Sequence, residues 1–400
     1  MMVKELSQEF YQNKRETLYD LLPDQSAAII GAGCEVSKSL DENYPFYVNN
    51  NYLYLTGLTE PEGILVLAKM HGQNSTTLFI RKPDPFKEKW FGRHISIDAA
   101  HQKSGIDDIR YLDEFESFCL DLKGLDYYED DTVPDHQKRE FGFEHKHSLL
   151  PLLSKMRLVK SEEELALMRH AIHLTHLGIN QILANLKPGD FEYQAQDIFE
   201  YTILSHGAEE TAFDTIAVSG EDAPILHYMT NRKRMADHTM ILFDLGARYR
   251  GYCSDISRTF PVNGHYTRDQ RALYEAVLQA QRDIIPYYQV GTNMRDVQEK
   301  SRELLNQYGL ATGLFDPEKT IDDYYYHGIG HSLGLDTHDL CEDRRVTLKP
   351  GMVITCEPGL YMADRGMGVR IEDDILITEA GPVVLSAEIP KSVDIIESMM

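Results

Sequence analysis

Residues 239–246 of the chain read Thr-Met-Ile-Leu-Phe-Asp-Leu-Gly. Four consecutive apolar residues lead into a single carboxylate, Asp244, which is typical of a buried strand that ends in a charged group. A buried carboxylate requires a partner, because its desolvation is costly. Asp255 follows eleven positions later, beyond Arg250 and Gly251 at an expected hairpin turn. Two hairpin strands would bring both carboxylates together, although a capped hairpin without function is the simpler interpretation of this pair alone.

A histidine pair, His327 and His331, encloses two glycines in the sequence His-Gly-Ile-Gly-His. The glycines disfavour a helix, so the pattern differs from the helical His-Glu-x-x-His of zinc peptidases. On a strand the two histidines would share one face, and the glycines would permit close approach of another backbone. His338 follows seven residues later, so three of the sixteen histidines fall within twelve residues. A chance cluster of core histidines is the alternative at this point.

Two further carboxylates follow apolar, strand-like sequence near the end of the chain. Glu357 comes directly after Val-Ile-Thr-Cys at 353–356, and Glu372 lies two positions after Arg370, so that both of the latter would point to one face of a strand. An ion pair alone would account for Arg370 and Glu372. Four strand-borne carboxylates and one imidazole also form an oxygen-rich ligand set, whose formal charge of about −4 two divalent cations would balance. Such ligands favour manganese or another first-row divalent ion over a thiolate-type zinc site.

Composition and charge restrict the classes of protein to which the chain can belong. Its 40 basic and 64 acidic residues give a formal net charge of −24, which disfavours nucleic acid and anionic membranes as partners. Its apolar runs are far shorter than the ~18 residues of a membrane span, and residues 1–10 lack a signal-peptide core. Five widely spaced cysteines indicate neither a disulfide scaffold nor a zinc finger. We therefore expect a soluble, cytoplasmic protein with no nucleic-acid or membrane partner.

The order of expected elements predicts two domains, residues 1–155 and residues 156–400. Ser161 and the three glutamates after it have the form of a capping box, which marks the first helix of the second domain. The first domain reads as a small α/β domain. Its expected elements are an amphipathic helix at 4–22 and strands at 27–31, 52–55, 63–68 and 76–80.

The second domain contains a weak internal repeat. Helix-like segments at 161–186 and 190–205 form one pair, and segments at 267–285 and 292–308 form another. Turn signals and strand-like sequence follow each pair, so we predict an α+β domain built from two related halves.

Two other patterns are interpreted without a function. His170, His173 and His176 recur at every third position of the first helix of the second domain and drift around it, so we take them as surface or packing residues. The sequence Gly-Ala-Gly at 31–33 lacks the third glycine of a dinucleotide-binding fingerprint.

The motifs of the second domain occur in a fixed order. They are Phe-Asp-Leu-Gly at 243–246, Asp255 with Arg-Thr-Phe at 258–260, His-Gly-Ile-Gly-His at 327–331, His-Asp at 338–339, Glu-Pro-Gly at 357–359 and Arg-Ile-Glu-Asp-Asp at 370–374. In this order they resemble the aminopeptidase P and prolidase family of proline-specific metallopeptidases. Tyr-Pro-Phe at 44–46 and Asp-Pro at 84–85 are similar to parts of the accessory domain of bacterial aminopeptidase P, although Tyr47 and Asn50 replace the Arg and Asp that the family often has there. The resemblance implies a pita-bread catalytic domain with pseudo-twofold halves, preceded by a smaller accessory domain.

The resemblance also implies a role for each candidate residue. The ligands of two divalent metal ions, most simply Mn²⁺, would be Asp244, Asp255, His331, Glu357 and Glu372, with Asp255 and Glu372 bridging both ions. Glu357 would in addition carry a proton to the leaving group. The remaining site residues would be His338 and His227, which hydrogen-bond the peptide carbonyl or the tetrahedral intermediate, and His327 and Arg370, which support the ligands.

The activity that the resemblance implies is hydrolysis of the Xaa-Pro bond at the N-terminus of a proline-containing peptide, by a hydroxide that bridges the two metal ions. Prolidase activity on Xaa-Pro dipeptides is the alternative enzyme. A metal-free binding protein on the same fold is the alternative outside the enzymes, and the five intact ligands argue against it. In related enzymes the segment around Trp90 lies at a subunit contact, so we expect a homodimer or homotetramer.

Overall fold

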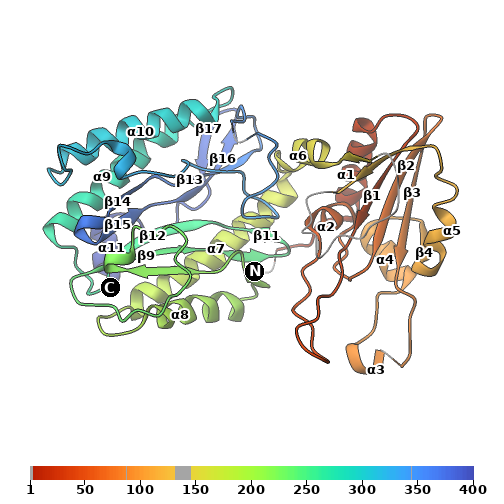
Figure 1. The fold of residues 1–400 in the computed structure, drawn as a ribbon, viewed down its shortest axis with the longest axis horizontal. Coiled ribbons are helices and arrows are strands. Elements are labelled where there is room, and N and C mark those ends of the chain that lie inside the picture. The colour runs from red at the N-terminus through yellow and green to blue at the C-terminus, as the bar shows by residue number, and fades with distance from the viewer. Residues whose placement is uncertain (1–2, 87, 131–145, 344) are drawn as a thin grey trace. The chain divides into compact units, whose positions relative to one another are not determined.

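The computed structural model describes residues 3–86, 88–130, 146–343 and 345–400. The chain divides into two compact units, residues 4–156 and residues 157–400, each with its own strands and helices (Figure 1). Among the described residues, no helix is at once long enough and apolar enough to cross a membrane.

The first unit is built on one mixed sheet with the strand order β4-β3-β2-β1-β5-β6. Its elements are α1 (Gln8–Leu21), β1 (Ser26–Gly31), α2 (Asn50–Thr56), β2 (Ile64–Met70), β3 (Gln73–Ile80), α3 (Glu88–Phe91), α4 (Ile97–Ser104), β4 (Asp108–Tyr111), α5 (Phe115–Phe118), β5 (Asp126–Glu129), β6 (Lys146–Ser148) and α6 (Leu150–Arg157), which ends at the boundary. Alternate apolar residues of β1 and β2, such as Ile29 and Val66, pack with Phe79 and Phe115 into a buried core.

One expected strand of this unit is a helix. Residues 52–55 lie inside α2, so the prediction of a strand there is wrong. The side chain of Asn49 accepts a hydrogen bond from the backbone of Asn51 and caps the N-terminus of α2, and Gly57 ends the helix with a left-handed φ of 73°. The alternating tyrosines and leucines at 52–55 are typical of a strand, but the two caps favour a helix, and the helix forms.

In the second unit, the two predicted helix pairs are confirmed. They are α7 (Glu162–Asn185) with α8 (Glu192–Ser205), and α9 (Arg268–Ile284) with α10 (Met294–Ala311). Ser161 caps α7 as expected: its side chain accepts from the backbone of Glu164, whose carboxylate accepts from the backbone of Ser161 in return.

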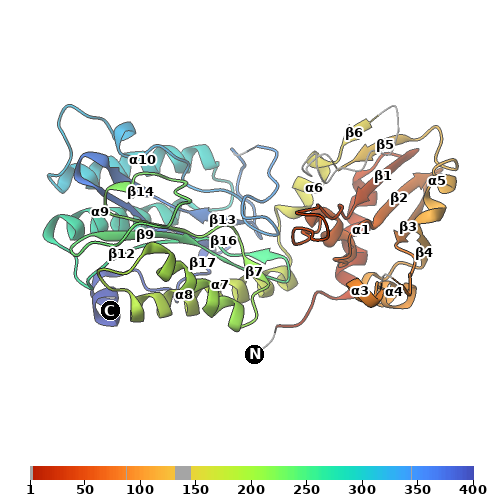
Figure 2. The same cartoon turned by 60° about the horizontal axis from the view of Figure 1, so that its bottom comes forward.

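Between these helix pairs lie the strands of the second unit, in the views of both Figure 1 and Figure 2. The remaining elements are β7 (Glu210–Thr211), β8 (Ile216–Ser219), β9 (Met240–Leu245), β10 (Ala247–Tyr249), β11 (Tyr252–Cys253), β12 (Ile256–Pro261), β13 (Val353–Cys356), β14 (Gly359–Met362), β15 (Met367–Arg370), β16 (Asp373–Thr378), β17 (Gly381–Val384) and α11 (Val393–Met399). Helices and strands therefore share one unit, as in the predicted α+β class.

The predicted hairpin around Arg250 and Gly251 is confirmed. β9 pairs antiparallel with β12, and this register places Ser257 opposite Asp244. The shorter strands β10 and β11 continue the hairpin to its turn, where Arg250 and Gly251 both have left-handed φ values, 51° and 84°. Two successive positive φ values match the twist of an antiparallel pair, so the hairpin fixes Asp244 relative to the residues around Asp255.

Candidate metal centre

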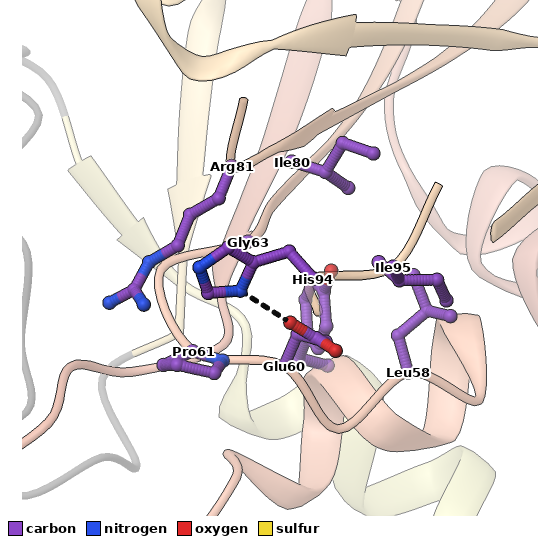
Figure 3. A pocket seen from close by; sticks show the side chains of 9 residues that line it. Leu58, Glu60, Pro61, Gly63, Ile80, Arg81, His94 and Ile95 are labelled. Atoms are coloured by element: carbon purple, nitrogen blue, oxygen red, sulfur yellow. Dashed lines mark hydrogen bonds and ion pairs between the residues drawn. The ribbon is translucent and has the colours of Figure 1, made fainter. Parts of the chain in front are cut away.

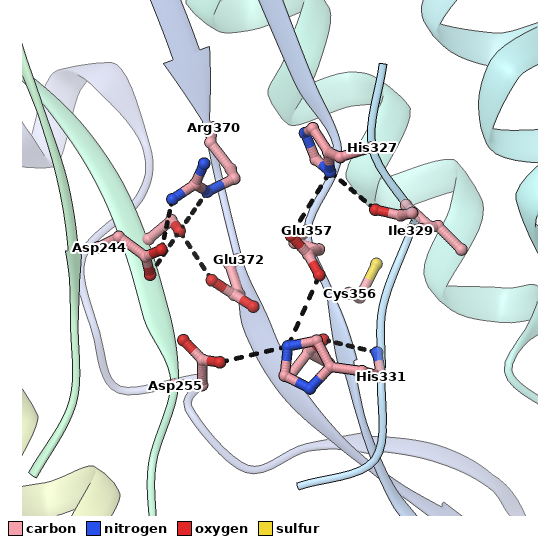
Figure 4. A network of polar contacts seen from close by, with 12 residues as sticks. Asp244, Asp255, His327, Ile329, His331, Cys356, Glu357, Arg370 and Glu372 are labelled. Carbon is pink, nitrogen blue, oxygen red and sulfur yellow. Dashed lines mark hydrogen bonds and ion pairs between the residues drawn. The ribbon is translucent and has the colours of Figure 1, made fainter. Parts of the chain in front are cut away.

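Four carboxylates converge from strand ends in the second unit, as Figure 4 shows. Asp244 lies near the end of β9, and Asp255 directly precedes β12, its antiparallel partner. Glu357 directly follows β13, and Glu372 lies between β15 and β16. Each of them is therefore held by the backbone of a strand or its immediate continuation.

His331 lies against this carboxylate cluster. Its Nε2 is 3.4 Å from Oδ2 of Asp255 and 3.7 Å from Oε1 of Glu357. One potential ligand atom from each of Asp255, His331 and Glu372 falls within 4.8 Å of the other two. The structure thus brings together the residues that were expected as metal ligands.

Ser257 connects the remaining carboxylates. Its hydroxyl oxygen is 2.7 Å from Oε2 of Glu372 and 3.1 Å from Oδ1 of Asp244. Arg370 donates to Ser257 over 2.6 Å and to Oδ2 of Asp244 over 2.5 Å. The buried Arg370 is therefore the cation nearest to Asp244, and the hydroxyl of Ser257 lies between the carboxylates of Asp244 and Glu372.

The electrostatics of the carboxylate cluster indicate that it requires positive charge. Burial, and then repulsion from Asp244, raises the pKa of Glu372 to about 7. Burial and the charge of Glu372 raise the pKa of Asp255 and of Glu357 well above the ordinary values. Carboxylates that repel one another in a buried site are stabilised by cations, and an oxygen-rich set with one imidazole suits hard or borderline divalent ions. The residues present therefore fit a metal centre.

His327 is placed on the far side of Glu357 from His331. Its Nδ1 lies 3.5 Å from Oε2 of Glu357, and its Nε2 is 2.9 Å from the hydroxyl of Tyr361. Burial and the nearby charge of Arg370 lower the pKa of His327 to about 3, so its ring is neutral at physiological pH. The neutral imidazole borders Glu357 without adding charge to the centre, and its Nδ1 lies 2.8 Å from the carbonyl oxygen of Gly328.

The expected strand at 327–331 is not a regular strand, so that prediction is wrong. The segment is irregular but runs beside β13: the backbone of Thr355 donates to the carbonyl of His331 (2.9 Å), and that of Glu357 donates to Ile329 (3.0 Å). The expected close backbone approach is confirmed at Gly330, where a Cβ atom would stand 2.0 Å from the carbonyl oxygen of Thr355. Only glycine fits this contact, which holds His331 against β13.

The last two expected residues, His338 and His227, differ in their surroundings. The ring of His338 lies 4.0 Å from the ring of His331, measured between centroids, so it borders the carboxylate cluster. His227 is exposed on the loop between β8 and β9, and within the described parts of the chain it makes no hydrogen bond to the cluster.

Sequence reasoning missed two polar residues of the centre. The first is Ser257, which lies two residues after Asp255 and is hydrogen-bonded to Glu372. The second is Tyr361, whose hydroxyl contacts both His327 and Arg370. The period-2 pattern would have found Ser257, because residues two apart on a strand share a face. Tyr361 lies four positions after Glu357, but Pro358 and Gly359 stand between them and interrupt the period-2 pattern, which therefore does not connect the two residues.

An enclosed cavity in the first unit is too small to be an alternative centre, and the open hollow of about 800 Å³ that shares Glu60, Arg81 and His94 with it holds no group of three metal-ligating side chains among the described residues. The enclosed cavity has a volume of about 10 Å³, room for roughly one water molecule. Figure 3 shows His94 pointing to Glu60 in its wall, with Nδ1 3.2 Å from the carboxylate.

Comparison with known proteins agrees with this architecture. The profile of the family described as "Metallopeptidase family M24" matches residues 166–379, and the profile described as "Aminopeptidase P, N-terminal domain" matches residues 11–126. The Xaa-Pro aminopeptidase of Escherichia coli (strain K12) is 35% identical, and the match covers 100% of this chain and 99% of the relative. Human Xaa-Pro aminopeptidase 3 is 31% identical, over 98% of this chain and 86% of the relative.

Solved structures are similar over almost the whole chain. Proline aminopeptidase P II from Yersinia pestis has a TM-score of 0.91 at 37% identity, and the match covers 99% of both chains. Aminopeptidase P from E. coli with the inhibitor Pro-Leu has a TM-score of 0.91 at 35% identity, again over 99% of both chains. These matches confirm the predicted fold class and the resemblance that the motifs indicate. With its carboxylate cluster between the two helix pairs and an accessory unit before it, the chain belongs to metallopeptidase family M24.

Proposed function

We propose that this protein is a Xaa-Pro aminopeptidase, which hydrolyses the bond between the first residue of a peptide and a following proline in a metal-dependent reaction. The observation that carries the proposal is the convergence of four strand-borne carboxylates and His331 in a buried site. The names of the relatives, which match over the full length of this chain, supply the reaction class.

Two divalent ions would be held by Asp244, Asp255, His331, Glu357 and Glu372, and we propose Mn²⁺ as the physiological ion. When bound, the ions would supply Lewis-acid activation of a water and of the scissile carbonyl. Asp255 and Glu372 each place a carboxylate oxygen within 4.8 Å of a ring nitrogen of His331 and of one another, and both are buried. In line with the family resemblance, these two carboxylates are the ones we propose would contact both ions.

The other side chains position substrate and protons. Glu357 would accept a proton from the attacking water and deliver it to the leaving nitrogen. His327 lies beside Oε2 of the same carboxylate. His338, beside the ring of His331, and His227, on its exposed loop, would donate hydrogen bonds to the peptide carbonyl as charge develops there. Arg370 keeps Asp244 in place through its short hydrogen bond.

The proline requirement has a steric basis. A proline removes the amide hydrogen of the scissile bond and fixes φ, so peptidases that depend on an N–H contact fail at this bond. A site that recognises the shape of the ring accepts it, and we propose proline-containing peptides as the substrates. Prolidase activity on dipeptides and metal-free binding are the two alternatives that the experiments below separate from this proposal.

We further propose that the protein is a cytoplasmic homodimer or homotetramer. Three large apolar side chains of the first unit support self-association: Phe86, Trp90 and Phe91 are 71%, 73% and 77% exposed. Apolar side chains clustered at the surface are typical of a subunit contact.

Metal analysis together with activity tests the proposed function. The protein as purified, after chelation, and after Mn²⁺ is restored would be compared for metal content and for release of the first residue from an Xaa-Pro-Yaa peptide. We expect about two ions per chain, loss of activity on chelation and recovery with Mn²⁺. A protein that holds no metal, or that cleaves the peptide equally well after chelation, would contradict the proposal.

A further inference from the structure

A second group of metal-ligating side chains lies in the second unit and shares no residue with the carboxylate cluster. It consists of His173 and His176 on α7 and Glu388, which follows β17. The sequence alone predicts these histidines to be surface or packing residues without a function. Residues three apart are neighbours on a helix surface, however, and the chain after β17 returns a carboxylate to this part of α7.

Two distances within this group equal those between neighbouring ligands of a tetrahedral ion. Nδ1 of His173 is 3.3 Å from Oε1 of Glu388, and Nδ1 of His176 is 3.3 Å from Oε2. One ligand atom of each residue lies within 4.8 Å of the others. Ligand atoms at about 2.0–2.1 Å from a tetrahedral zinc ion stand about 3.3–3.4 Å apart. Each imidazole nitrogen is therefore at ligand spacing from one oxygen of the carboxylate, Oε1 for His173 and Oε2 for His176.

Hydrogen bonding at His176 is incomplete without a further group. Its Nδ1 is buried and has no hydrogen-bond partner among the described residues, because the contact with Glu388 lacks the required direction. Its Nε2 lies 2.8 Å from the side-chain amide of Asn180, whose Oδ1 is also buried without a partner in the described chain.

The amide of Asn180 can supply the support that a metal-bound histidine requires. A half-turn of the amide lets Oδ1 accept a proton from Nε2 of His176, which leaves the lone pair of Nδ1 directed into the group. Histidine ligands usually donate their second ring N–H to such a neighbour, which fixes the tautomer.

We propose that His173, His176 and Glu388 form a surface site for a divalent first-row cation, with Zn²⁺ as the ion that best suits two imidazoles and one carboxylate. This ligand set leaves a fourth tetrahedral position for water. The side chains of His173 and Glu388 are 48% and 44% exposed, so the ion has access from solvent.

The ion would link α7 to the segment 386–390, which makes hydrogen bonds to residues next to the carboxylate cluster. Pro390, two residues beyond Glu388, accepts a hydrogen bond from Nε of Arg258 (3.0 Å), and Arg258 also donates to the backbone carbonyl of Glu372. Ser386 donates to Asp373 over 2.7 Å. An ion that binds the folded chain and not the unfolded one raises its thermal stability.

Zinc stoichiometry tests this site independently of catalysis. Wild type, His176→Ala and Glu388→Gln would be dialysed against the same free Zn²⁺ and analysed for bound metal. Any zinc at the carboxylate cluster is present in all three proteins and cancels in the comparison. We expect wild type to bind one ion more than each variant, and zinc to raise the unfolding temperature of wild type more than that of the variants.

Two matched substitutions sharpen the result. His170→Ala removes a histidine of the same helix whose ring packs edge-on against Tyr249 instead of joining the group, and this variant should bind as much zinc as wild type. Asn180→Ala should retain the ion with an affinity lowered on the order of tenfold, because Asn180 only positions His176. Mn²⁺-supported peptidase activity shows that each variant is folded.

Equal zinc content in wild type, His176→Ala and Glu388→Gln would overturn the proposal, and the histidine–glutamate contacts would then be ordinary ion pairs. A loss of one ion in His170→Ala as well would also overturn it, since the binding would not depend on the proposed ligands.

Discussion

Oδ2 of Asp255 lies 3.4 Å from Nε2 of His331. Asp255 belongs to the hairpin that follows the first helix pair, and His331 belongs to the segment beside β13 that follows the second pair. Their contact is where the two predicted halves of the second unit meet. A cation between them would therefore connect the halves through their side chains, in addition to the backbone contacts of the fold.

Asp255→Asn is expected to empty the metal centre. The substitution removes a buried charge that the bound ions share, and the amide that replaces it is a weaker ligand. We expect both ions to be lost in elemental analysis, with peptidase activity falling to background. Asp364→Asn is the matched control, because Asp364 is an exposed carboxylate paired with Lys319. A variant that kept two ions would show that Asp255 is not a ligand to both.

His338→Ala is expected to retain metal and lose rate. The ring of His338 borders that of His331 without belonging to the proposed ligand set. Removal of one preorganised donor lowers kcat on the order of 10²–10³. Metal content and kcat would be measured in the same preparation, with the exposed His238 replaced by alanine as control. Wild-type kcat in His338→Ala would refute the role assigned to this histidine.

The network of Arg157, Lys160 and Asp339 predicts a pH-dependent contribution to stability. Lys160 lies 3.0 Å from Oδ2 of Asp339, and Arg157 pairs with Oδ1; all three side chains are buried. Burial alone would raise the pKa of Asp339, but the charges of Arg157 and Lys160 outweigh it and hold that pKa below its ordinary value. The ordinary value in the unfolded chain is about 3.9. The contribution of Asp339 is therefore fully present above that pH and is lost as pH falls through the lower folded-state pKa.

Asp339→Asn should accordingly destabilise the protein at neutral pH by about 3–5 kcal/mol, because Arg157 is left buried without its full counter-charge. The difference from wild type should shrink below about pH 4. Chemical denaturation across this pH range measures both effects. Asp322→Asn, which removes an exposed partner of Arg302, should change stability by no more than about 1 kcal/mol. A constant difference down to about pH 3 would mean that Asp339 is not the titrating group.

Much of the second unit follows from local sequence signals. The predicted cap Ser161 and the predicted helix start at Thr267 place the beginnings of α7 and α9 within one residue, and the left-handed turn at Arg250 and Gly251 closes the expected hairpin. Asp244 and Asp255 were therefore placed together by short-range information alone.

Other features depend on contacts that are distant in sequence. The approach of Gly330 to Thr355 keeps 327–331 beside β13 without a regular ladder, and no periodicity within the segment reports that contact. The strand expected at 52–55 was overridden by its caps, Asn49 and Gly57. Glu388 reaches α7 only through the path of the chain after β17, so a pattern search along the helix could not pair it with His173.

Self-association is expected to depend on the exposed aromatic segment of the first unit. Light scattering should show a dimer or tetramer for wild type, and Trp90→Glu with Phe91→Glu should shift it toward monomer, because charge in an apolar contact is costly. Leu40→Glu is the control, since Leu40 is also a fully exposed apolar residue of the same unit. A monomeric wild type at working concentration would rule out the proposed assembly.

Substrate length separates the two enzyme alternatives. A prolidase must neutralise the free carboxylate of the proline in an Xaa-Pro dipeptide, which requires a cationic group directed at the substrate. The buried Arg370 is engaged instead with Asp244, Ser257 and the hydroxyl of Tyr361. A dipeptide carboxylate that finds no cationic partner in the site loses about 1–3 kcal/mol of binding.

We therefore expect kcat/KM for an Xaa-Pro-Yaa tripeptide to exceed that for the matching Xaa-Pro dipeptide by about tenfold or more, since about 1.4 kcal/mol corresponds to tenfold. In the tripeptide the carboxyl group of proline is an uncharged amide, so no free carboxylate has to be desolvated next to the ring. An Xaa-Ala-Yaa peptide of the same length serves as control for the proline requirement. Cleavage of the dipeptide alone would assign the enzyme to prolidases, and it would require a cation other than Arg370 to bind the carboxylate.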